Sequence, residues 1–450
     1  MGGHVTLGRA PIRTVLHRTN VSDVLFQLAW RSGDAVISFS FAHLADLHLD
    51  TPFSGLASLN EVLAARLKDA SLAAWDRAVQ ACLDHAVDFV VISGDVYDSD
   101  TASVRAQLRF RRGLERLSDA GIPALIVHGN HDPNGGRYSA IDRWPALVTI
   151  FGTREVEHVE IRRGDDLLAV VSGISFPERH VQDNLARRYH RTAHSAYHVG
   201  VLHTNVDGDA AHGVYAPCSL QDLVDSRYDY WALGHIHARR VLRAHAPAVV
   251  YPGNIQARHP NETGPKGFAV VQVQEGVEQL HWIDTDTWRF TTVTCDVADL
   301  SALAEVEEAL ATQAAALGGD RPLILRGRVT GRGALHQDLQ RPGAAASLLE
   351  ALRDAASPDL WWDDVQVSTR PAFDRQKRLE GEDFIADLLR QADRLDAHAL
   401  VQNLTTELRR HSQLSSVEAL LGLDAAMLDA PDLLREAEDL ALALLEGAPA

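Results

Sequence analysis

Short apolar runs alternate with amphipathic stretches through the first 130 residues of the chain. The apolar runs at residues 36–44, 88–93 and 124–128 each end in a polar cluster and predict buried strands. Between them, apolar residues recur at helical spacing and predict helices from Asn60 to His85 and from Thr101 to Ala120. A strand and helix alternation of this kind predicts parallel strands covered by helices.

Beyond residue 150 the pattern changes to shorter segments of alternating apolar and polar residues. A short helix is predicted from Pro217 to Ser226. Strands are predicted at residues 156–161, 167–171, 197–202, 230–233, 249–254, 267–273 and 279–283. We expect these strands to build a second sheet, so that residues 36–290 form an α/β (α+β) unit of two packed mixed sheets with outer helices.

The last third of the chain predicts two further parts. Residues 291–372 read strand, helix, strand, helix, strand, which predicts a small α+β cap of the split βαβ type. Residues 373–450 carry leucines at helical spacing and predict a helical tail, in which a partner docks or the helices pack on one another. Residues 1–35 lack periodicity and predict a disordered extension or a misassigned translation start.

Composition and charge restrict the cellular compartment and the binding partners that we expect for this chain. The chain has three widely spaced cysteines and no apolar run near the roughly 20 residues of a membrane span, so we expect a cytoplasmic protein without disulfides. The net charge is −18, and residues 291–450 hold 28 acidic and 15 basic residues. Residues 1–290 are therefore nearly neutral, which argues against tight unaided binding of DNA but allows affinity supplied by a partner.

Metal-type ligands follow five of the predicted strands. Asp, His and Asn side chains at strand ends suit Mn, Fe or Zn, whereas an all-oxygen set would suit Mg or Ca. Seven ligands are too many for one catalytic ion, so we predict two divalent ions bridged by Asp95. One ion takes Asp46, His48, Asp95 and His237, and the other takes Asp95, Asn130, His203 and His235. Two such ions would activate a water for attack on phosphorus and hold the phosphoryl oxygens.

Three more residues are candidates for catalysis. His131 follows ligand Asn130 and is placed to protonate or neutralise the leaving oxygen. Asp132 is predicted to fix the His131 tautomer. Asp98 is assigned either to support the metal ligands or to face the substrate, although a solvated loop fits that position equally well. Arg258 and Lys266 lie in a polar loop that either contacts the phosphate backbone or is an ordinary hairpin connection.

The motifs resemble those of the calcineurin-like metallophosphoesterases. These motifs are Asp46-Leu47-His48, Gly94-Asp95, Gly129-Asn130-His131-Asp132, His203 and Gly234-His235-Ile236-His237. Further segments, Tyr215-Ala216-Pro217-Cys218-Ser219-Leu220, Tyr228–His235, Tyr251-Pro252-Gly253-Asn254 and Glu262–Phe268, are similar to SbcD-like DNA repair exonucleases, most of all the bacterial YhaO-type branch. The resemblance covers residues 37–290 well and weakens beyond them.

This resemblance implies a two-sheet metallophosphoesterase sandwich with two Mn ions that acts on DNA ends beside an SMC-like ATPase. It also implies that His131 is the catalytic histidine. Asp98 stands where some members have a histidine linked to exonuclease activity, so the polarity of cleavage stays open, as does a homodimer. A small-molecule phosphodiesterase or phosphatase with the same site is the rival hypothesis. A scaffold with a vestigial site is disfavoured because every proposed ligand is present.

Overall fold

The structure is a computed structural model. It describes residues 38–51, 53, 67, 69–98, 103–133, 141, 143–208, 215–319, 321–373, 375–408 and 430–445. The predicted extension at residues 1–35 and the start of the helix predicted from Asn60 lie outside the described residues. No helix in the described part of the chain is both long and apolar enough to cross a membrane.

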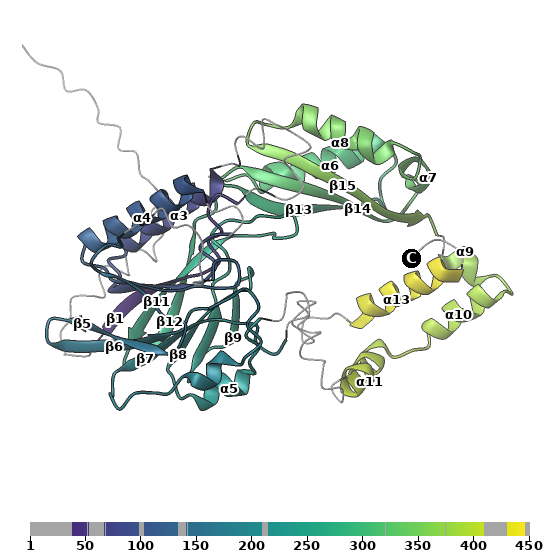
Figure 1. Cartoon of the computed structure of the whole chain (residues 1–450). Helices are drawn as coiled ribbons and strands as arrows, with labels where there is room; N and C mark the ends of the chain where they lie inside the picture. The colour runs from purple at the N-terminus through teal and green to yellow at the C-terminus, as the bar shows by residue number, and fades with distance from the viewer. Residues whose placement is uncertain are drawn as a thin grey trace, which may run out of the picture. The chain divides into compact units, whose positions relative to one another are not determined.

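Two six-stranded mixed sheets form the first domain (Figure 1). The first sheet has the order β12-β11-β1-β2-β3-β4, with β1 (Ser38–Leu44), β2 (Phe89–Ser93), β3 (Ala124–Val127), β4 (Val148–Ile150), β11 (Gly267–Gln274) and β12 (Val277–Asp284). The second has the order β5-β6-β7-β8-β10-β9, with β5 (Glu157–Arg163), β6 (Asp166–Gly173), β7 (Tyr197–His203), β8 (Tyr230–Gly234), β9 (Arg240–Arg243) and β10 (Ala248–Tyr251). The predicted pair of mixed sheets is confirmed.

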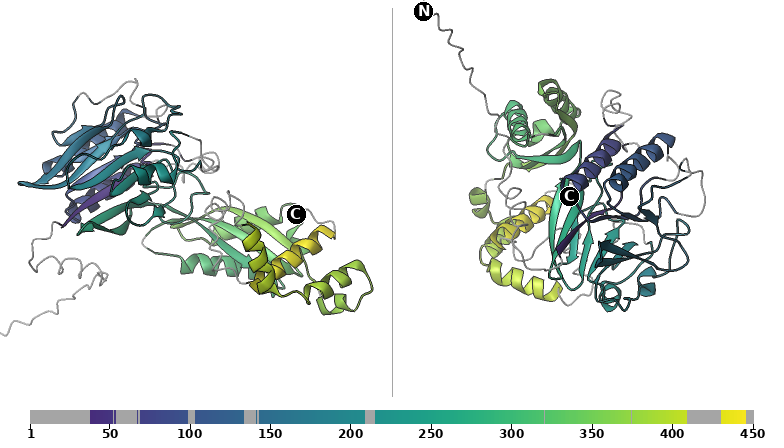
Figure 2. Two further views of the ribbon diagram at one scale, coloured as in Figure 1. Left: turned by 90° about the horizontal axis from the view of Figure 1, so that it is seen from below. Right: turned by 90° about the vertical axis from the view of Figure 1, so that its left-hand side faces the viewer.

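Alternation of side chains along the strands builds two cores on the first sheet. Phe39 and Phe41 of β1 face the second sheet, while Ala42 and Leu44 face the helices. Those helices are α3 (Ala70–Asp84) and α4 (Val104–Asp119), which lie side by side over the sheet (Figure 2). The outer face of the second sheet is covered by α5 (Leu220–Asp225), the 3₁₀ turn η2 (Leu185–Arg188) and loops.

One part of the predicted sheet membership is wrong. The pattern places β11 and β12 in the second sheet, but β11 pairs antiparallel with β1, with Ser38 opposite Gln274. The chain therefore returns to the first sheet after β10, because the free edge of β1 offers a full row of backbone partners. The short strands β4 and β9 were not predicted.

The middle domain is a three-stranded parallel sheet with helices on one face (Figure 2). It contains β13 (Arg289–Asp296), α6 (Leu303–Ala316), β14 (Leu323–Gly333), α7 (His336–Leu339), α8 (Ala344–Ala355) and β15 (Leu360–Pro371). The predicted split arrangement is wrong, because consecutive strands are neighbours in the order β13-β14-β15. Two ordinary βαβ crossovers suffice when both helices pack on the same face.

Buried charges join the middle domain to the first domain. Asp286 is fully buried and accepts hydrogen bonds from Arg289, at 2.8 Å, and from Arg321 at the start of β14. Arg77 of α3 donates to the Asp286 carbonyl oxygen at 2.7 Å. A buried carboxylate is tolerated only when it is paired in this way, so the network ties the two domains at this point.

The C-terminal helices are α9 (Arg375–Leu379), α10 (Phe384–Ala392), α11 (Ala397–Leu408) and α13 (Ala430–Leu445). Arg375 of α9 forms ion pairs with Asp393, directly after α10, and with Glu438 of α13, each at 2.7 Å. Phe384 is 67% exposed and Leu404 is 52% exposed. The predicted helical tail is therefore present, and it displays large apolar side chains to solvent.

Candidate metal centre

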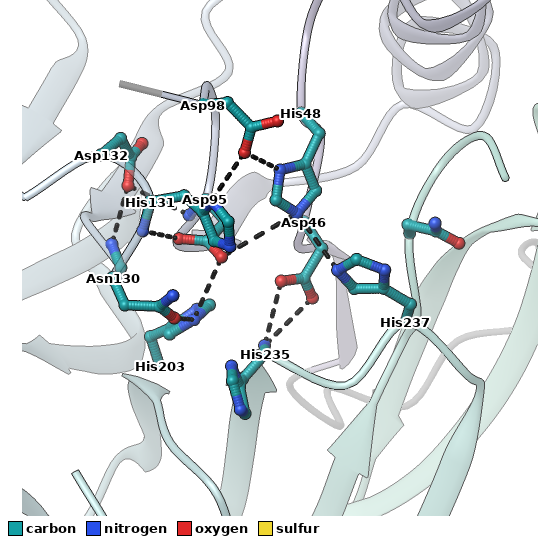
Figure 3. Close-up of polar contacts among 12 residues, drawn as sticks. Asp46, His48, Asp95, Asp98, Asn130, His131, Asp132, His203, His235 and His237 are labelled. Atoms are coloured by element: carbon teal, nitrogen blue, oxygen red, sulfur yellow. Dashed lines mark hydrogen bonds and ion pairs between the residues drawn. The ribbon is translucent and has the colours of Figure 1, made fainter. Parts of the chain in front are cut away.

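Five strand ends bring the predicted ligands together, as Figure 3 shows. Asp46 and His48 follow β1, Asp95 follows β2, and Asn130 follows β3. His203 ends β7, while His235 and His237 follow β8. The described residues that group as candidate metal ligands include the sets Asp46–His48–His237 and Asp46–Asp95–His203. The parallel strands therefore deliver these residues to one edge of the two sheets. His235 contributes its backbone amide, which donates to Asp46, and its ring meets the His203 ring.

The backbone at this edge is strained. Asp46, His48, Asp95 and His235 have φ angles of 52°, 42°, 53° and 106°, a region that residues other than glycine rarely adopt. Hydrogen bonds between the loops hold this conformation, because the Asp46 amide donates to Gly94 and the His48 amide donates to the Asp95 carbonyl. Such strain is typical of functional sites whose surroundings fix an unfavourable conformation.

The motif glycine Gly129 is needed for space. A Cβ atom at Gly129 would overlap the Asp95 carboxylate and the His203 ring. Only a residue without a side chain allows β3 to approach these two ligands so closely.

Two candidate ligands, His48 and His237, face each other through their Nε2 atoms. The Nδ1 atoms of His48 and His237 lie 3.0 Å from Asp98 Oδ1 and 2.7 Å from Glu262 Oε1. An ionised carboxylate only accepts hydrogen bonds, so both Nδ1 atoms must donate. Burial holds the pKa of His48 well below its usual value. The two Nε2 atoms then face each other across 3.1 Å. A divalent cation bound here would take both Nε2 atoms as ligands, together with the Asp46 carboxylate of the same group.

A second group of candidate metal donors surrounds His203. His203 Nδ1 donates to the Ser93 carbonyl oxygen at 2.9 Å, and burial lowers the pKa of His203 to about 4. Its unprotonated Nε2 lies 2.9 Å from Asn130 Oδ1 and 3.4 Å from Asp95 Oδ2. An imidazole lone pair, an amide oxygen and a carboxylate oxygen converge here, and these are metal donors.

The two carboxylates at the centre also require positive charge. Asp95 Oδ2 lies between the histidine groups, 3.4 Å from His203 Nε2 and 3.9 Å from His48 Nε2. Burial, and then the Asp132 charge, raise the pKa of Asp95 to about 7, and burial with the Asp95 charge raises that of Asp46. Cations would keep both carboxylates ionised at neutral pH. The donor set therefore fits two divalent ions, with Asp95 placed to contact both.

His131 lies beside the ligands, and its ring contacts the His48 ring with centroids 5.1 Å apart. Its Nδ1 is 2.7 Å from Asp98 Oδ1, and its side chain is 45% exposed. The hydrogen bond with Asp98 raises the pKa of His131. This imidazole can therefore hold a proton near neutral pH and present it to a bound substrate.

Comparison with known protein families agrees with this geometry. Residues 39–239 match the family model described as calcineurin-like phosphoesterase. The chain carries a calcineurin-like metallophosphoesterase domain. Residues 290–370 match the middle domain of metallophosphoesterase YhaO, next to this metallophosphoesterase domain.

Curated relatives of the metallophosphoesterase domain include proteins with nuclease and repair names. The chain is 42% identical over 237 residues to the uncharacterized metallophosphoesterase YhaO of Bacillus subtilis. The aligned residues cover 53% of the chain and 58% of that protein. The chain is 25% identical over 276 residues to a subunit of the nuclease SbcCD of the same species, covering 53% of the chain and 67% of the relative. The DNA double-strand break repair protein Mre11 of Thermoplasma acidophilum is 25% identical over 223 residues, with 47% and 58% covered. The match thus spans little more than half of the first relatives.

The structure changes the role of Asp132 in the metallophosphoesterase site. The predicted contact between Asp132 and His131 is absent from the interactions of the described residues. Its carboxylate accepts backbone hydrogen bonds from Gly129 at 2.8 Å, Val96 at 2.8 Å and Asp95 at 3.2 Å. Asp132 therefore joins the β2 and β3 loops, and Asp98 takes the place beside His131.

Asp98 is not a solvated loop residue. It contacts His48, His131 and Arg258, whose guanidinium lies 2.8 Å from Asp98 Oδ2. Burial disfavours the Asp98 charge, but hydrogen bonds from His131 and His48 outweigh burial and hold the pKa of this carboxyl well below its usual range. Asp98 thus orients a metal ligand and the candidate acid at once.

The two predicted substrate contacts have different outcomes. Arg258 reaches the site through Asp98, and its side chain is 19% exposed. Lys266 is only 5% exposed, and its Nζ donates to the His237 carbonyl oxygen at 3.1 Å. This buried ammonium supports the loop that carries His237, so the structure does not support Lys266 as a substrate contact.

Sequence reasoning missed the role of Glu262. Its Oε1 accepts from His237 Nδ1, and its Oε2 accepts from Asn254 at 2.9 Å and from the Arg258 amide at 2.7 Å. The segment containing Glu262 stands out in the sequence only through its family resemblance. An acidic residue in a loop gives no sign of its partner when the two lie 25 positions apart.

Replacing Glu262 with glutamine should weaken metal binding about 10- to 100-fold, as loss of a carboxylate partner to a ligating histidine does. The amide can offer N–H to His237 Nδ1, which favours the tautomer with a proton on Nε2, the atom that faces the metal. Calorimetric titration of the metal-free protein with Mn²⁺ measures the change. Glu275→Gln, in the exposed β11–β12 turn, is the matched control and should titrate like the wild type. An unchanged affinity in Glu262→Gln would contradict the assigned tautomer.

Proposed function

We propose that this chain is a dinuclear metal-dependent phosphodiester hydrolase that degrades DNA from its ends together with an SMC-like ATPase. The observation that carries the hydrolase assignment is the pair of Nε2 atoms of His48 and His237, 3.1 Å apart, beside a second donor group around His203. These two groups share Asp95. Two adjacent ions in such a centre hold the attacking and leaving oxygens of a phosphoryl group and activate water.

The chain's own residues supply the proton and the orientation. Asp98 accepts a hydrogen bond from His131 Nδ1, which leaves the Nε2 proton of this partly exposed ring for the substrate. In the proposed reaction that proton passes to the leaving 3′ or 5′ oxygen of the substrate as the ester bond breaks. Arg258, fixed on Asp98, adds a positive charge near the phosphate.

We propose Mn²⁺ as the physiological metal. The site combines imidazole, carboxylate and amide donors, a mixture that suits Mn, Fe and Zn better than Mg or Ca. Fe²⁺ and Zn²⁺ are the competing ions in a titration.

DNA as substrate and the ATPase as partner are supported by the relatives and by the tail. The relatives SbcCD and Mre11 carry nuclease and DNA repair in their names. The apolar side chains exposed on the helical tail, such as Phe384 and Leu404, offer a surface for a partner. The net charge of −18 fits an enzyme that gains DNA affinity from another protein. We place the complex in the cytoplasm, in keeping with three buried, unpaired cysteines.

The deciding experiment is a nuclease assay with Mn²⁺ on linear single- and double-stranded DNA, with and without a candidate SMC-like ATPase. Loss of nucleotides from the ends is the expected result, and the ATPase should increase the rate on duplex ends. Hydrolysis restricted to nucleotide monoesters or cyclic nucleotides would overturn the DNA assignment and favour the small-molecule phosphodiesterase.

The pH profile should depend on Asp98. Because the hydrogen bond with Asp98 raises the pKa of His131, and because the protonated imidazole is the active acid, activity should be present below this pKa and lost as the pH rises through it. Asp98→Asn should move the alkaline limb of kcat/KM to lower pH by about one unit or more. The profile is measured at saturating Mn²⁺, because Asp98 also orients His48. An alkaline limb that stays in place would contradict the role of His131 as acid.

A further inference from the structure

A row of rings leads from the metal centre to the surface. His203, which is fully buried, meets the His235 ring with centroids 5.2 Å apart and planes at 71°. His235 meets Tyr215 at 5.6 Å and 82°, and Tyr215 stacks on His180 at 5.6 Å with only 29° between planes. Exposure increases along the row, because His235 is 7% exposed, Tyr215 is partly exposed and His180 is exposed.

Backbone hydrogen bonds fix the outer two rings in place. The Ala216 amide donates to the Val181 carbonyl oxygen at 2.6 Å and so joins the loops that carry Tyr215 and His180. The Asn205 amide donates to the Tyr215 carbonyl oxygen at 3.1 Å, and Thr204 Oγ1 donates to the Ala216 carbonyl oxygen at 2.6 Å. Both anchors directly follow His203 at the end of β7, so the stacked pair keeps a constant position relative to the candidate ligands.

Tyr215 packs against the core on the outer face of the second sheet, but it differs from the buried tyrosines in its hydroxyl group and its exposure. The hydroxyl groups of Tyr189, Tyr197 and Tyr251 each donate a hydrogen bond, to the Val201 carbonyl oxygen, to Glu278 and to the Thr204 carbonyl oxygen. Within the described part of the chain, no hydrogen bond engages the Tyr215 hydroxyl. The ring is instead positioned by its neighbours and remains partly open to solvent, which is the arrangement of a contact surface.

We propose that Tyr215 and His180 form a platform on which a nucleobase stacks while the phosphate of the same or the next nucleotide occupies the metal centre. This inference rests on the proposed function. One sugar separates a base from its phosphate, and one ring-to-ring step of 5.6 Å separates Tyr215 from candidate ligand His235. Every base has a π face, so stacking holds a nucleotide without selecting its sequence, as an enzyme that digests DNA progressively requires.

The test compares two strands of DNA that differ only in whether the three terminal nucleotides at the digested end carry bases. Stacking on an aromatic side chain is worth about 1–3 kcal/mol per base, so Tyr215→Leu should lower kcat/KM about 5- to 150-fold on the strand with bases. On the strand without terminal bases, Tyr215→Leu should equal the wild type. Tyr215→Trp should retain activity on both strands, and His180→Ala should show a smaller loss confined to the strand with bases.

Controls separate stacking from damage to the fold or to the metals. His194→Ala removes an exposed histidine whose ring pairs with Glu160, and it should change neither substrate. Thermal unfolding and bound Mn²⁺ are measured for each variant. The platform would be overturned if Tyr215→Leu lost equal activity on both strands. It would also be overturned if Tyr215→Leu and His180→Ala had wild-type activity on the strand with bases. Either result would leave the nuclease assignment in place. Wild-type protein without activity on any DNA would overturn the proposed function and the platform with it.

Discussion

Replacing Asp95 with asparagine is expected to reduce Mn-dependent hydrolysis about 10³-fold or more. Asp95 Oδ2 faces His203 on one side and His48 on the other, so this single carboxylate serves both donor groups. Loss of the bridging charge removes several kcal/mol of stabilisation from the phosphoryl centre, and about 1.4 kcal/mol corresponds to a factor of ten. Asparagine keeps the shape and the oxygen that accepts from the His131 amide.

Two measurements accompany the rate. Elemental analysis should find fewer than two Mn²⁺ per Asp95→Asn chain, and Mn²⁺ should no longer raise its unfolding temperature, because ligand stabilisation follows affinity. Burial raises the pKa of Asp95 to about 7, so without metal the neutral amide removes an unfavourable buried charge. Metal-free Asp95→Asn should therefore unfold at or above the temperature of the metal-free wild type. The exposed control Asp299→Asn should behave as the wild type, and two tightly bound Mn²⁺ in Asp95→Asn would contradict the shared role.

His131→Asn should lower kcat on DNA about 10²- to 10⁴-fold, the usual contribution of a general acid. The His131 ring lies to one side of the two donor groups and is held by Asp98, so Mn²⁺ binding should persist. The effect therefore differs from that of Asp95→Asn, in which metal binding and rate fall together.

The leaving group identifies the function of His131. A p-nitrophenolate leaves without protonation, so His131→Asn should lose far less activity on bis-p-nitrophenyl phosphate than on DNA. His194→Asn, which changes an exposed histidine that pairs with Glu160, is the control. A similar loss on both substrates would assign His131 a role other than proton donation.

The sequence was sufficient to predict the candidate ligands because parallel strands end at one edge. Asp46, Asp95 and Asn130 each follow an apolar strand of the first sheet, and His203 ends a strand of the second sheet. Parallel strands direct the residues at their carboxyl ends to a common edge. The same reasoning could not place β11, whose alternation is as compatible with one sheet as with the other. Its pairing with β1 depends on contacts between residues more than 200 positions apart.

The partners of the ligands were less predictable for a related reason. Adjacency in sequence suggested that Asp132 orients His131, but successive side chains in a tight loop point in different directions. Asp132 turns to the backbone of Gly129 and Val96, and Asp98 reaches His131 from the β2 loop. Loop geometry, and not proximity in the sequence, also brings Glu262 to its hydrogen bond with His237. Hydrogen-bond partners of this kind are set by loop geometry, which apolar periodicity does not encode.

The paired charges at Asp286 have a mechanical consequence. They fasten the start of β14 to the first domain, and further along β14 Arg326 donates to Asn261 at 3.1 Å. Asn261 belongs to the loop that carries Arg258 and Glu262 into the metal centre. Force applied to the middle domain would be transmitted along a stiff strand to that loop. Tension could thus alter the catalytic geometry without any change in the sheets that hold the other ligands.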